Sequence, residues 1–381
     1  MLLPSLRGAP RQATIARLEI FRLKVNARGN WIIARLTTDS GVQGIGDASQ
    51  GGADEDVAAY LDRFFQLLKG RSVHDIEWLR QAAEPEIAQD GLRAAVAQSA
   101  LEQCLWDIRG KLFGVPVYDL LGGRVQQKIR NYANINRSTD PRTPEGFARM
   151  AERAIAAGFD AVKLAPFDDM PHDLSDRGRI EEFTKLGIAR VAAVRQAIGS
   201  NNDLLVDVHS HLDVERGIDL AHRLEPLNLF WLEEITPANP VANLAAVHRA
   251  AKMPIAGGEL IHGVKGFYPY IAGNAVDIVM PDPKYCGGPL EMKKIAALAE
   301  AAKLKVSPHG PASPVGNVVS AHVGSTMPNF LILELSYGEV PWRADLIDPP
   351  ERITKSCLPL TDRPGFGISL NEKTVAKYRI V

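Results

Sequence analysis

The sequence contains few cysteines and almost no net charge. Cys104, Cys286 and Cys357 are its three cysteines among 381 residues, and no CxxC pair occurs. Thiols this few and scattered make neither a disulfide framework nor a cysteine zinc site, so we expect them to be reduced and packed. The formal net charge of −1 gives no broad attraction for nucleic acid or an anionic membrane. An anionic substrate therefore has to be captured locally.

Long apolar runs are also missing. No run of about 18 apolar residues occurs, and the start, MLLPSLRGAPRQATIARLEIF, lacks the apolar stretch of a secretory signal. We therefore expect a cytoplasmic protein. The segments GIGDAS and GGPLE match neither a P-loop nor a complete GxGxxG motif, and no serine nucleophile elbow is present. No nucleotide is indicated.

The order of expected strands and helices divides the chain into three parts. Apolar and polar residues alternate as in strands over residues 14–25 and 31–38, with a turn at NARGN between them. A third candidate strand is GVQGIGDAS, and helical periodicity follows over residues 54–121. Further strands are expected near 130–135, 160–165, 203–208, 229–233, 254–257, 276–280, 304–307 and 329–334. Eight strands with helical intervals predict an α/β fold, a (β/α)₈ barrel. We predict an α+β domain at 1–125, the barrel at 126–347, and a segment at 348–381 that packs back on the first domain.

Three acidic residues stand at the ends of successive expected strands. Glu233 follows Asp207 by 26 positions, and Glu259 follows Glu233 by 26, about one βα unit. In a barrel these ends meet at the C-terminal mouth, where (β/α)₈ enzymes hold their chemistry. Three carboxylates gathered there would repel one another without a hard cation, usually Mg²⁺. Glu234 competes with Glu233, but adjacent strand residues face opposite sides, so only one of them faces the metal.

A histidine and an aspartate end the next two expected strands. Asp282 ends the sixth in MPD, and His309 lies 27 positions later in VSPHGP, at the end of the seventh. Adjacent strand ends allow Asp282 to accept a hydrogen bond from one imidazole nitrogen, which leaves the other free to take a proton. Alternatively, His309 caps a loop and Asp282 starts a helix, but the carboxylate cluster favours catalysis. His209, two residues after Asp207, points to the same side as that ligand, where it could protonate a departing hydroxide.

These motifs resemble those of the enolase superfamily, in its mandelate racemase and muconate lactonising enzyme branch. The resemblance runs from RLTTDSGVQGIGDAS through ALEQCLWDIRGKLFGVPVYDLLGG to the acidic strand ends. It implies a modified, enolase-like TIM barrel that binds Mg²⁺ and is capped by the N-terminal α+β domain. It further implies removal of a proton α to a carboxylate, which gives a metal-stabilised enediolate. The resemblance favours Glu233 over Glu234 as the ligand.

The resemblance also implies roles for residues on the face opposite His309. The family often carries Lys-x-Lys at the end of the second strand, its second lysine being a base. Here Lys163 is present, but Ala165 occupies the second position. Lys163 would contact the substrate carboxylate or the metal shell, or pair with Glu234 as a buried structural lysine. His209 resembles the general acid of the sugar-acid dehydratases of this family.

Other residues are candidates for substrate contacts. Glu334, in NFLILELS, resembles a protonated family glutamate that hydrogen-bonds the substrate carboxylate, with its pKa raised by burial and nearby negative charge. Glu339 is its rival, and His211 and His262 have ambiguous roles near the rim. Further candidates for substrate contact are Asn134, Asn136, Arg137, Gln50, Trp342 and Arg343, together with Gly29, Trp31, Gly51 and Gly52 in loops of the capping domain.

The first hypothesis is therefore a Mg²⁺-dependent dehydratase of an aldonate or aldarate. His309, oriented by Asp282, removes the C2 proton, His209 assists loss of the C3 hydroxide, and a 2-keto-3-deoxy acid results. The resemblance implies an R configuration at C2 and a homo-oligomer. Two alternatives remain: a one-base cycloisomerase, and an epimerase that uses His309 with His209 or Lys163. A non-catalytic barrel that binds a sugar acid or serves as a scaffold also stays open.

Overall fold

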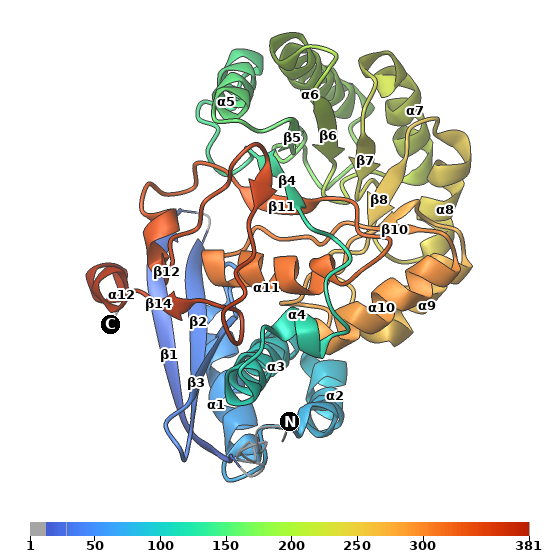
Figure 1. Ribbon diagram of the computed structural model, residues 1–381. Helices are drawn as coiled ribbons and strands as arrows, with labels where there is room; N and C mark the ends of the chain where they lie inside the picture. Colours follow the sequence, from blue (N-terminus) through green and yellow to red (C-terminus); the bar gives the residue numbers. More distant parts are fainter. Residues whose placement is uncertain (1–12, 28, 381) are drawn as a thin grey trace, which may run out of the picture.

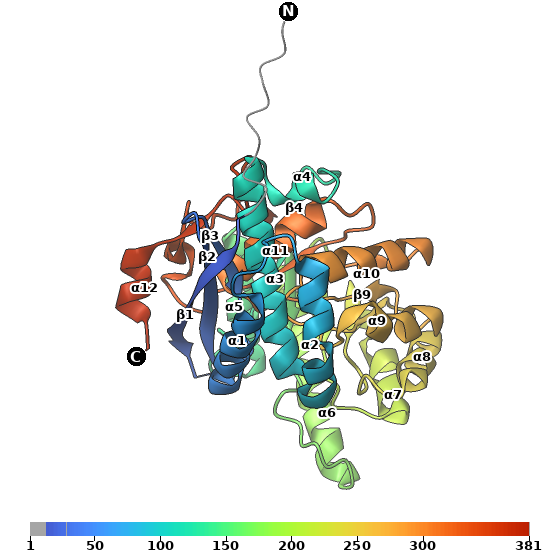
Figure 2. The ribbon, with the colours of Figure 1, turned by 90° about the horizontal axis from the view of Figure 1, so that it is seen from below.

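The computed structural model describes residues 13–27 and 29–380. The first twelve residues, part of the segment considered for a secretion signal, and residue 28, in the expected NARGN turn, lie outside the described residues. The chain forms a small antiparallel sheet with its own helices and a larger curled parallel sheet with helices around it (Figures 1 and 2). No helix within the described ranges is both long and apolar enough to cross a membrane.

The N-terminal part has three strands followed by helices, as the sequence predicts. Strands β1 (Ile15–Asn26), β2 (Gly29–Thr38) and β3 (Gln43–Asp47) form an antiparallel sheet in that order. Helices α1 (Asp54–Leu68), α2 (Ile76–Asp90), α3 (Leu92–Phe113) and the short α4 (Val117–Leu120) follow. Glycines let α3 lie directly on β3, since a Cβ at Gly44 would lie 2.2 Å from the Cys104 carbonyl oxygen and one at Gly46 would lie 2.2 Å from that of Ala100. This part forms the cap.

Eight parallel strands of the described residues form the curled sheet. They are β4 (Ile129–Asn134), β5 (Ala161–Leu164), β6 (Asp203–Asp207), β7 (Trp231–Glu233), β8 (Ile255–Gly257), β9 (Ile278–Val279), β10 (Lys305–Val306) and β11 (Leu333–Ser336). Their order is β10-β9-β8-β7-β6-β5-β4-β11, and a parallel bridge between Val306 and Phe330 brings its two ends together. Both faces of the sheet are covered, and several strands accordingly contain short apolar runs, as in LLV of β6 and IAG of β8. The sheet is therefore a barrel of the expected kind.

Helices alternate with these strands and surround the sheet (Figure 1). They are α5 (Pro144–Ala156), α6 (Arg177–Ile198), α7 (Val214–Leu224), α8 (Val241–Ala250), α9 (Gly263–Ala272), α10 (Pro289–Ala301) and α11 (Pro314–Ser325), with a 3₁₀ turn, η1, at Glu225–Leu227. Helix α11 is buried along its whole length, because it lies between the barrel and the cap. Most of its side chains are small or apolar, as such a position favours, and the buried polar ones include Asn317, which donates to Glu351 Oε1 at 2.8 Å.

The eighth strand begins later than the sequence predicts. The expected span was 329–334, whereas β11 covers Leu333–Ser336. The backbone before β11 is hydrogen-bonded to β10 instead. The Val306 N–H donates to the Asn329 carbonyl at 3.0 Å, and the Leu331 N–H donates to the Val306 carbonyl at 2.8 Å. Pairing with β4 starts only at Leu333. Glu334 is therefore the second residue of its strand rather than the end.

The cap is fastened to the loop between β9 and α10. Three hydrogen bonds join α3 to this loop: Gln103 to the Pro283 carbonyl at 3.1 Å, Gln98 to the Gly287 carbonyl at 3.3 Å, and the Gly287 N–H to Ser99 at 3.1 Å. A fourth, from the Leu290 N–H to Glu102 at 2.8 Å, joins α3 to the first turn of α10. Gly288, with φ of +95°, has no room for a side chain because a Cβ would lie 2.7 Å from Glu102 Cδ. The same loop carries Asp282.

The C-terminal part crosses both the barrel and the cap. After η2 (Arg343–Leu346), strand β12 (Ile347–Asp348) pairs with β14 (Ser369–Leu370), and β13 (Cys357–Leu358) pairs with β4. The Val117 N–H donates to the Gly365 carbonyl at 2.8 Å, and the final helix α12 (Glu372–Tyr378) packs on β1. This segment ties the two parts of the molecule together.

Candidate active site

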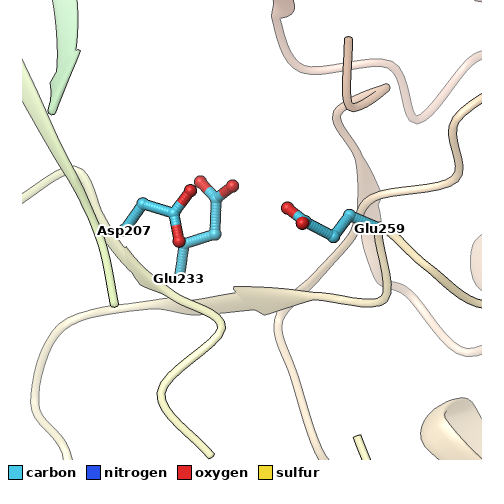
Figure 3. Close-up of side chains that lie close together, drawn as sticks. All are labelled: Asp207, Glu233 and Glu259. Atoms are coloured by element: carbon cyan, nitrogen blue, oxygen red, sulfur yellow. The ribbon is translucent and has the colours of Figure 1, made fainter. Parts of the chain in front are cut away.

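Three carboxylates meet at the C-terminal mouth of the barrel (Figure 3). Asp207 ends β6, Glu233 ends β7, and Glu259 follows β8 by two residues. Asp207 and Glu233 are paired positions of neighbouring parallel strands, so register alone places them side by side. One oxygen from each of the three residues lies within 4.8 Å of the others. The structure thus brings together the three residues singled out by their spacing.

Glu234 points away from this cluster. Its carboxylate accepts hydrogen bonds from the Gly258 N–H at 2.6 Å and from Ser210 Oγ at 3.1 Å. Its backbone lies in the left-handed region, with φ of +45°. Burial, with the charge of Glu259, raises the pKa of Glu234 to about 7. Glu234 therefore supports the backbone around Glu259, and Glu233 alone of this pair joins the cluster.

Lys163 lies beneath the cluster, among three carboxylates. Its Nζ is 2.5 Å from Glu233 Oε1, 3.1 Å from Glu334 Oε1 and 3.4 Å from Asp207 Oδ2. The expected alternative, a structural pair with Glu234, is wrong because that carboxylate faces elsewhere. Burial opposes the charge of Lys163, but the surrounding carboxylates outweigh it and raise its pKa well above the usual value.

The pKa of Glu334 shifts opposite to the expected direction. Burial alone would raise it, but the charges of Lys163 and His309 lower it to about 2. Hydrogen bonds from the Gly310 N–H at 2.9 Å and from Asn134 Nδ2 at 2.6 Å act in the same direction. The sequence shows that Glu334 is buried but not that an ammonium lies beside it. The lowered pKa favours the ionised form of Glu334.

The cluster fits a divalent cation. Burial, and then the charges of Asp207, Glu334 and Glu259, raise the pKa of Glu233 well above its usual value, although Lys163 opposes them. Glu259 Oε2 is buried and accepts no hydrogen bond within the described part of the chain, although His309 Nε2 lies 3.4 Å away. Hard cations prefer carboxylate oxygens as ligands, and a bound cation would relieve the repulsion among these three side chains. Asp207, Glu233 and Glu259 could hold such an ion.

His309 faces the cluster from the side of β10. Its Nδ1 is 2.8 Å from Asp282 Oδ2, and its Nε2 points toward Glu259 Oε2. Burial disfavours an imidazolium here, but Glu259 and the hydrogen bond to Asp282 raise the pKa of His309 above its usual value. The expected pair of neighbouring strand ends is present. Nδ1 is engaged by Asp282, so Nε2 is the nitrogen free for proton transfer.

Lys284 is a member of this arrangement that the sequence analysis missed. Its Nζ donates to Asp282 Oδ2 at 2.7 Å, its backbone N–H donates to Asp282 Oδ1 at 2.8 Å, and the side chain is fully buried. Burial opposes the ionised form of Asp282, but Lys284 and His309 lower its pKa. The available signal was a lysine two positions after a strand-end aspartate, which alone is too common to single out.

His209 faces the cluster from the side of β6. Its Nε2 is 3.1 Å from Asp207 Oδ2, and its Nδ1 is 2.5 Å from Asp168 Oδ1. Burial lowers the pKa of His209, but the charge of Asp207 and the hydrogen bond to Asp168 outweigh it and raise the pKa to about 12. Asp168 follows β5 and was not among the predicted residues. Ala165, in the position of the family's second lysine, lies in the same segment.

The polar residues proposed for substrate contact bind other side chains of the site. Asn134 donates to Glu334, Asn136 Nδ2 donates to Asp168 Oδ2 at 3.0 Å, and Arg137 donates to Glu339 at 2.9 Å. These contacts connect the end of β4 with β11 and the residues after it, and with the segment that follows β5. Gln50 Oε1 is buried and accepts no hydrogen bond within the described ranges.

The remaining candidates lie in several different places. Trp342 is buried, with its ring stacked on Tyr378 at 4.0 Å and edge-on to Trp31 at 5.1 Å. Trp31 itself is inside β2 and buried rather than in a loop. Gly29 and Gly52 line a surface hollow of the cap, and Gly29 packs against Gly51. The other candidates are buried Arg343, which binds Glu351; His211, stacked on His172 at 4.8 Å; and His262, bonded to the Tyr285 carbonyl at 2.9 Å.

Comparison with known proteins identifies the family of this chain. Residues 146–374 match the model described as enolase C-terminal domain-like, and residues 20–122 match the mandelate racemase / muconate lactonizing enzyme N-terminal domain. The chain belongs to the enolase superfamily. A solved structure of this superfamily, the mandelate racemase/muconate lactonizing enzyme from Jannaschia sp. CCS1, is 29% identical and superposes with a TM-score of 0.85 over 97% of this chain and 98% of the other.

The relatives of this enolase superfamily member include named dehydratases. The D-gluconate dehydratase of Thermoproteus tenax is 30% identical over 96% of this chain and 74% of its own length. The D-xylonate dehydratase of Haloferax volcanii is 30% identical over 98% of this chain and 91% of its own length. A D-galactonate dehydratase family member of Streptomyces bingchenggensis is 30% identical over 98% of this chain and 95% of its own length. Dehydratases are lyases, and this chain is an enzyme of the same class.

Proposed function

We propose that the enzyme dehydrates a hydroxylated sugar acid, an aldonate or aldarate, to a 2-keto-3-deoxy acid with Mg²⁺ bound by Asp207, Glu233 and Glu259. One observation carries the proposal: two imidazoles on different strands direct Nε2 toward the same carboxylate cluster. His309 Nε2 lies 3.4 Å from Glu259, and His209 Nε2 lies 3.1 Å from Asp207. Dehydration needs one group that takes a proton and another that gives one, so the pair matches the reaction. The related gluconate, xylonate and galactonate dehydratases support the substrate class.

His309 is the base in this proposal. Asp282 holds Nδ1, so Nε2 takes the proton from C2 of the substrate, and the C2–H electron pair enters an enediolate. Mg²⁺ would supply positive charge for the two carboxylate oxygens on which negative charge develops. Lys163 adds a fixed positive charge beneath the cluster, within 3.4 Å of Asp207, Glu233 and Glu334. A base on this side alone matches a C2 centre of R configuration, as the family resemblance implies.

His209 is the acid. Its Nε2 donates a proton to the C3 hydroxyl as the C3–O bond breaks, so that water leaves rather than hydroxide. The enol then becomes the 2-keto-3-deoxy acid. Ala165 lacks a basic group, and we assign the acid role on this face to His209 because its Nε2 lies 3.1 Å from Asp207 Oδ2. If His209 instead delivered its proton to C2, the enzyme would be an epimerase, and the product distinguishes the two reactions because only dehydration lowers the mass.

A substrate screen tests the proposal. Purified enzyme with Mg²⁺ is incubated with a library of aldonates and aldarates, and keto products are detected with semicarbazide. We expect a keto-deoxy product from at least one sugar acid, lost in His309→Asn and on removal of the metal with EDTA. C2 proton exchange in D₂O without a keto product would replace dehydration with epimerisation or cycloisomerisation. Neither exchange nor product, with Asp207→Asn keeping its biological activity, would identify a binding or scaffold protein.

A further inference from the structure

The segment between β5 and α6 supplies a partner for His209. Asp168 Oδ1 lies 2.5 Å from His209 Nδ1, although the two residues are 41 positions apart in sequence. The other oxygen of Asp168 accepts from Asn136 Nδ2 at 3.0 Å and from Arg142 at 3.2 Å. Arg142 also donates to the Ala165 carbonyl at 2.7 Å. Asp168 is therefore held by two donors on its far side while it faces the imidazole.

The arrangement matches the one on the opposite side of the mouth. His309 presents Nδ1 to Asp282 and Nε2 to a carboxylate of the cluster, and His209 presents Nδ1 to Asp168 and Nε2 to another. In each case a second basic side chain secures the aspartate, Lys284 for Asp282 and Arg142 for Asp168. Each histidine thus lies between an aspartate and a carboxylate of the cluster.

We propose that Asp168 is the positioning residue of the acid side, which keeps His209 Nδ1 hydrogen-bonded and its Nε2 directed at the hydroxyl that leaves. This inference rests on the proposed dehydration. With Nδ1–H bound to Asp168, the transferable proton is on Nε2, from which it passes to the C3 oxygen. The electron pair of the enediolate C1=C2 bond forms the C2=C3 double bond as the carboxylate is restored, the C3–O electron pair leaves with its oxygen as water, and His209 is left neutral. The C2 proton stays on His309, so protons and electrons balance.

This role is tested by measuring how the enediolate divides between loss of the C3 hydroxyl and return of a proton to C2. Without its acceptor, the imidazole can turn or carry its proton on the wrong nitrogen, so elimination slows, while His309 still removes and returns the C2 proton. A positioned acid contributes about 10²- to 10⁴-fold to a rate. We therefore expect Asp168→Asn to lower the rate of keto-acid formation at least about tenfold, and to raise the ratio of C2 deuterium exchange to dehydration by a similar factor in D₂O. His209→Asn should raise the same ratio, and Asp168→Glu should restore part of the loss.

The adjacent Asp169 provides a matched control. It lies in the same segment and forms two 2.7 Å hydrogen bonds with Arg190, but the structure shows no contact between Asp169 and His209. Asp169→Asn removes the same charge and loosens the same segment. It should lower the melting temperature without changing the ratio of exchange to dehydration. An equal change of that ratio in both variants would overturn the proposal, because Asp168 would then act only through the order of the segment.

Proton NMR of ¹⁵N-histidine-labelled enzyme gives a second readout that needs no substrate. We expect a far-downfield Nδ1–H signal from His209 that persists in His309→Asn and Asp169→Asn but is lost in Asp168→Asn and His209→Asn. Absence of that signal from the wild-type enzyme would overturn the pairing itself. If the signal behaves as expected but no sugar acid is dehydrated or exchanged, the proposed function fails and the role of Asp168 in elimination falls with it, while the hydrogen bond stands.

Discussion

The Lys163→Met substitution removes the ammonium beneath the three site carboxylates and nearly preserves the length of the side chain. At an effective dielectric constant of about 20, unit charges 3.1 Å apart, as in the pair with Glu334, attract by about 5 kcal/mol. The cost of burying both groups offsets part of this. Removing one partner of a buried ion pair typically costs about 3–5 kcal/mol, because the other charge stays buried and unpaired. We expect this loss in the free energy of unfolding, measured with urea in the presence of EDTA.

Saturating Mg²⁺ should reduce that loss. The cation binds the same carboxylates and stabilises only the folded state, and the variant, with one positive charge fewer, has more repulsion for the cation to relieve. The double variant Lys163→Met/Glu334→Gln is the control, since removal of the opposite charge should recover part of the stability. A loss below about 1 kcal/mol in EDTA, or the same loss with and without Mg²⁺, would refute the idea that Lys163 balances the charge of the metal ligands.

Three further predictions concern other parts of the molecule. Burial raises the pKa of Glu102 to about 8 from 4.5, so the folded state holds a proton that the unfolded state has lost. The free energy of unfolding of the wild type should therefore fall as pH rises from about 4.5 to 8, by up to about 4 kcal/mol relative to Glu102→Gln. Urea titrations of both proteins at each pH measure this difference, and parallel plots of unfolding free energy against pH would contradict the prediction. In Lys284→Met the charge of Asp282 is no longer balanced by the lysine, so it raises the pKa of His309 further. The rising limb of the profile of kcat/KM against pH should therefore move to higher pH. An unchanged limb would show that Lys284 does not affect the pKa of His309. Gly44→Ala places a Cβ 2.2 Å from a backbone oxygen of α3, so the melting temperature should fall by several degrees, corresponding to about 1–3 kcal/mol, and no decrease would show that α3 shifts freely.

The parts of the site that the sequence reveals are those determined by register. Asp207 and Glu233 end two consecutive strands, and Glu259 follows the end of the next strand by two residues. Parallel pairing converts their even spacing in sequence into proximity in space. The same reasoning places His309 beside Asp282. The barrel strands and cap elements also follow from periodicity, apart from β11, whose start depends on which neighbour the preceding backbone joins.

The parts that the sequence did not reveal depend on how loops cross between strands. Asp168 contacts His209 because the segment after β5 lies beside the residues that follow β6. The next residue, Asp169, binds Arg190 instead. The ionised state of Glu334 depends on an ammonium contributed by another strand. Likewise, the interior position of Trp342 results from the returning C-terminal helix, whose Tyr378 stacks on its ring. No local pattern records these long-range contacts.

The hydrogen bonds between α3 and the loop after β9 have a consequence for protein engineering. The backbone that carries Asp282 is held by Gln98, Ser99, Glu102 and Gln103, all of them on the cap. A chimera that joins the cap of one relative to the barrel of another would therefore change the side chains that hold the backbone beside its own base. Crossover points that keep α3 with residues 280–290 should yield active hybrids more often than points at the boundary between the two domains.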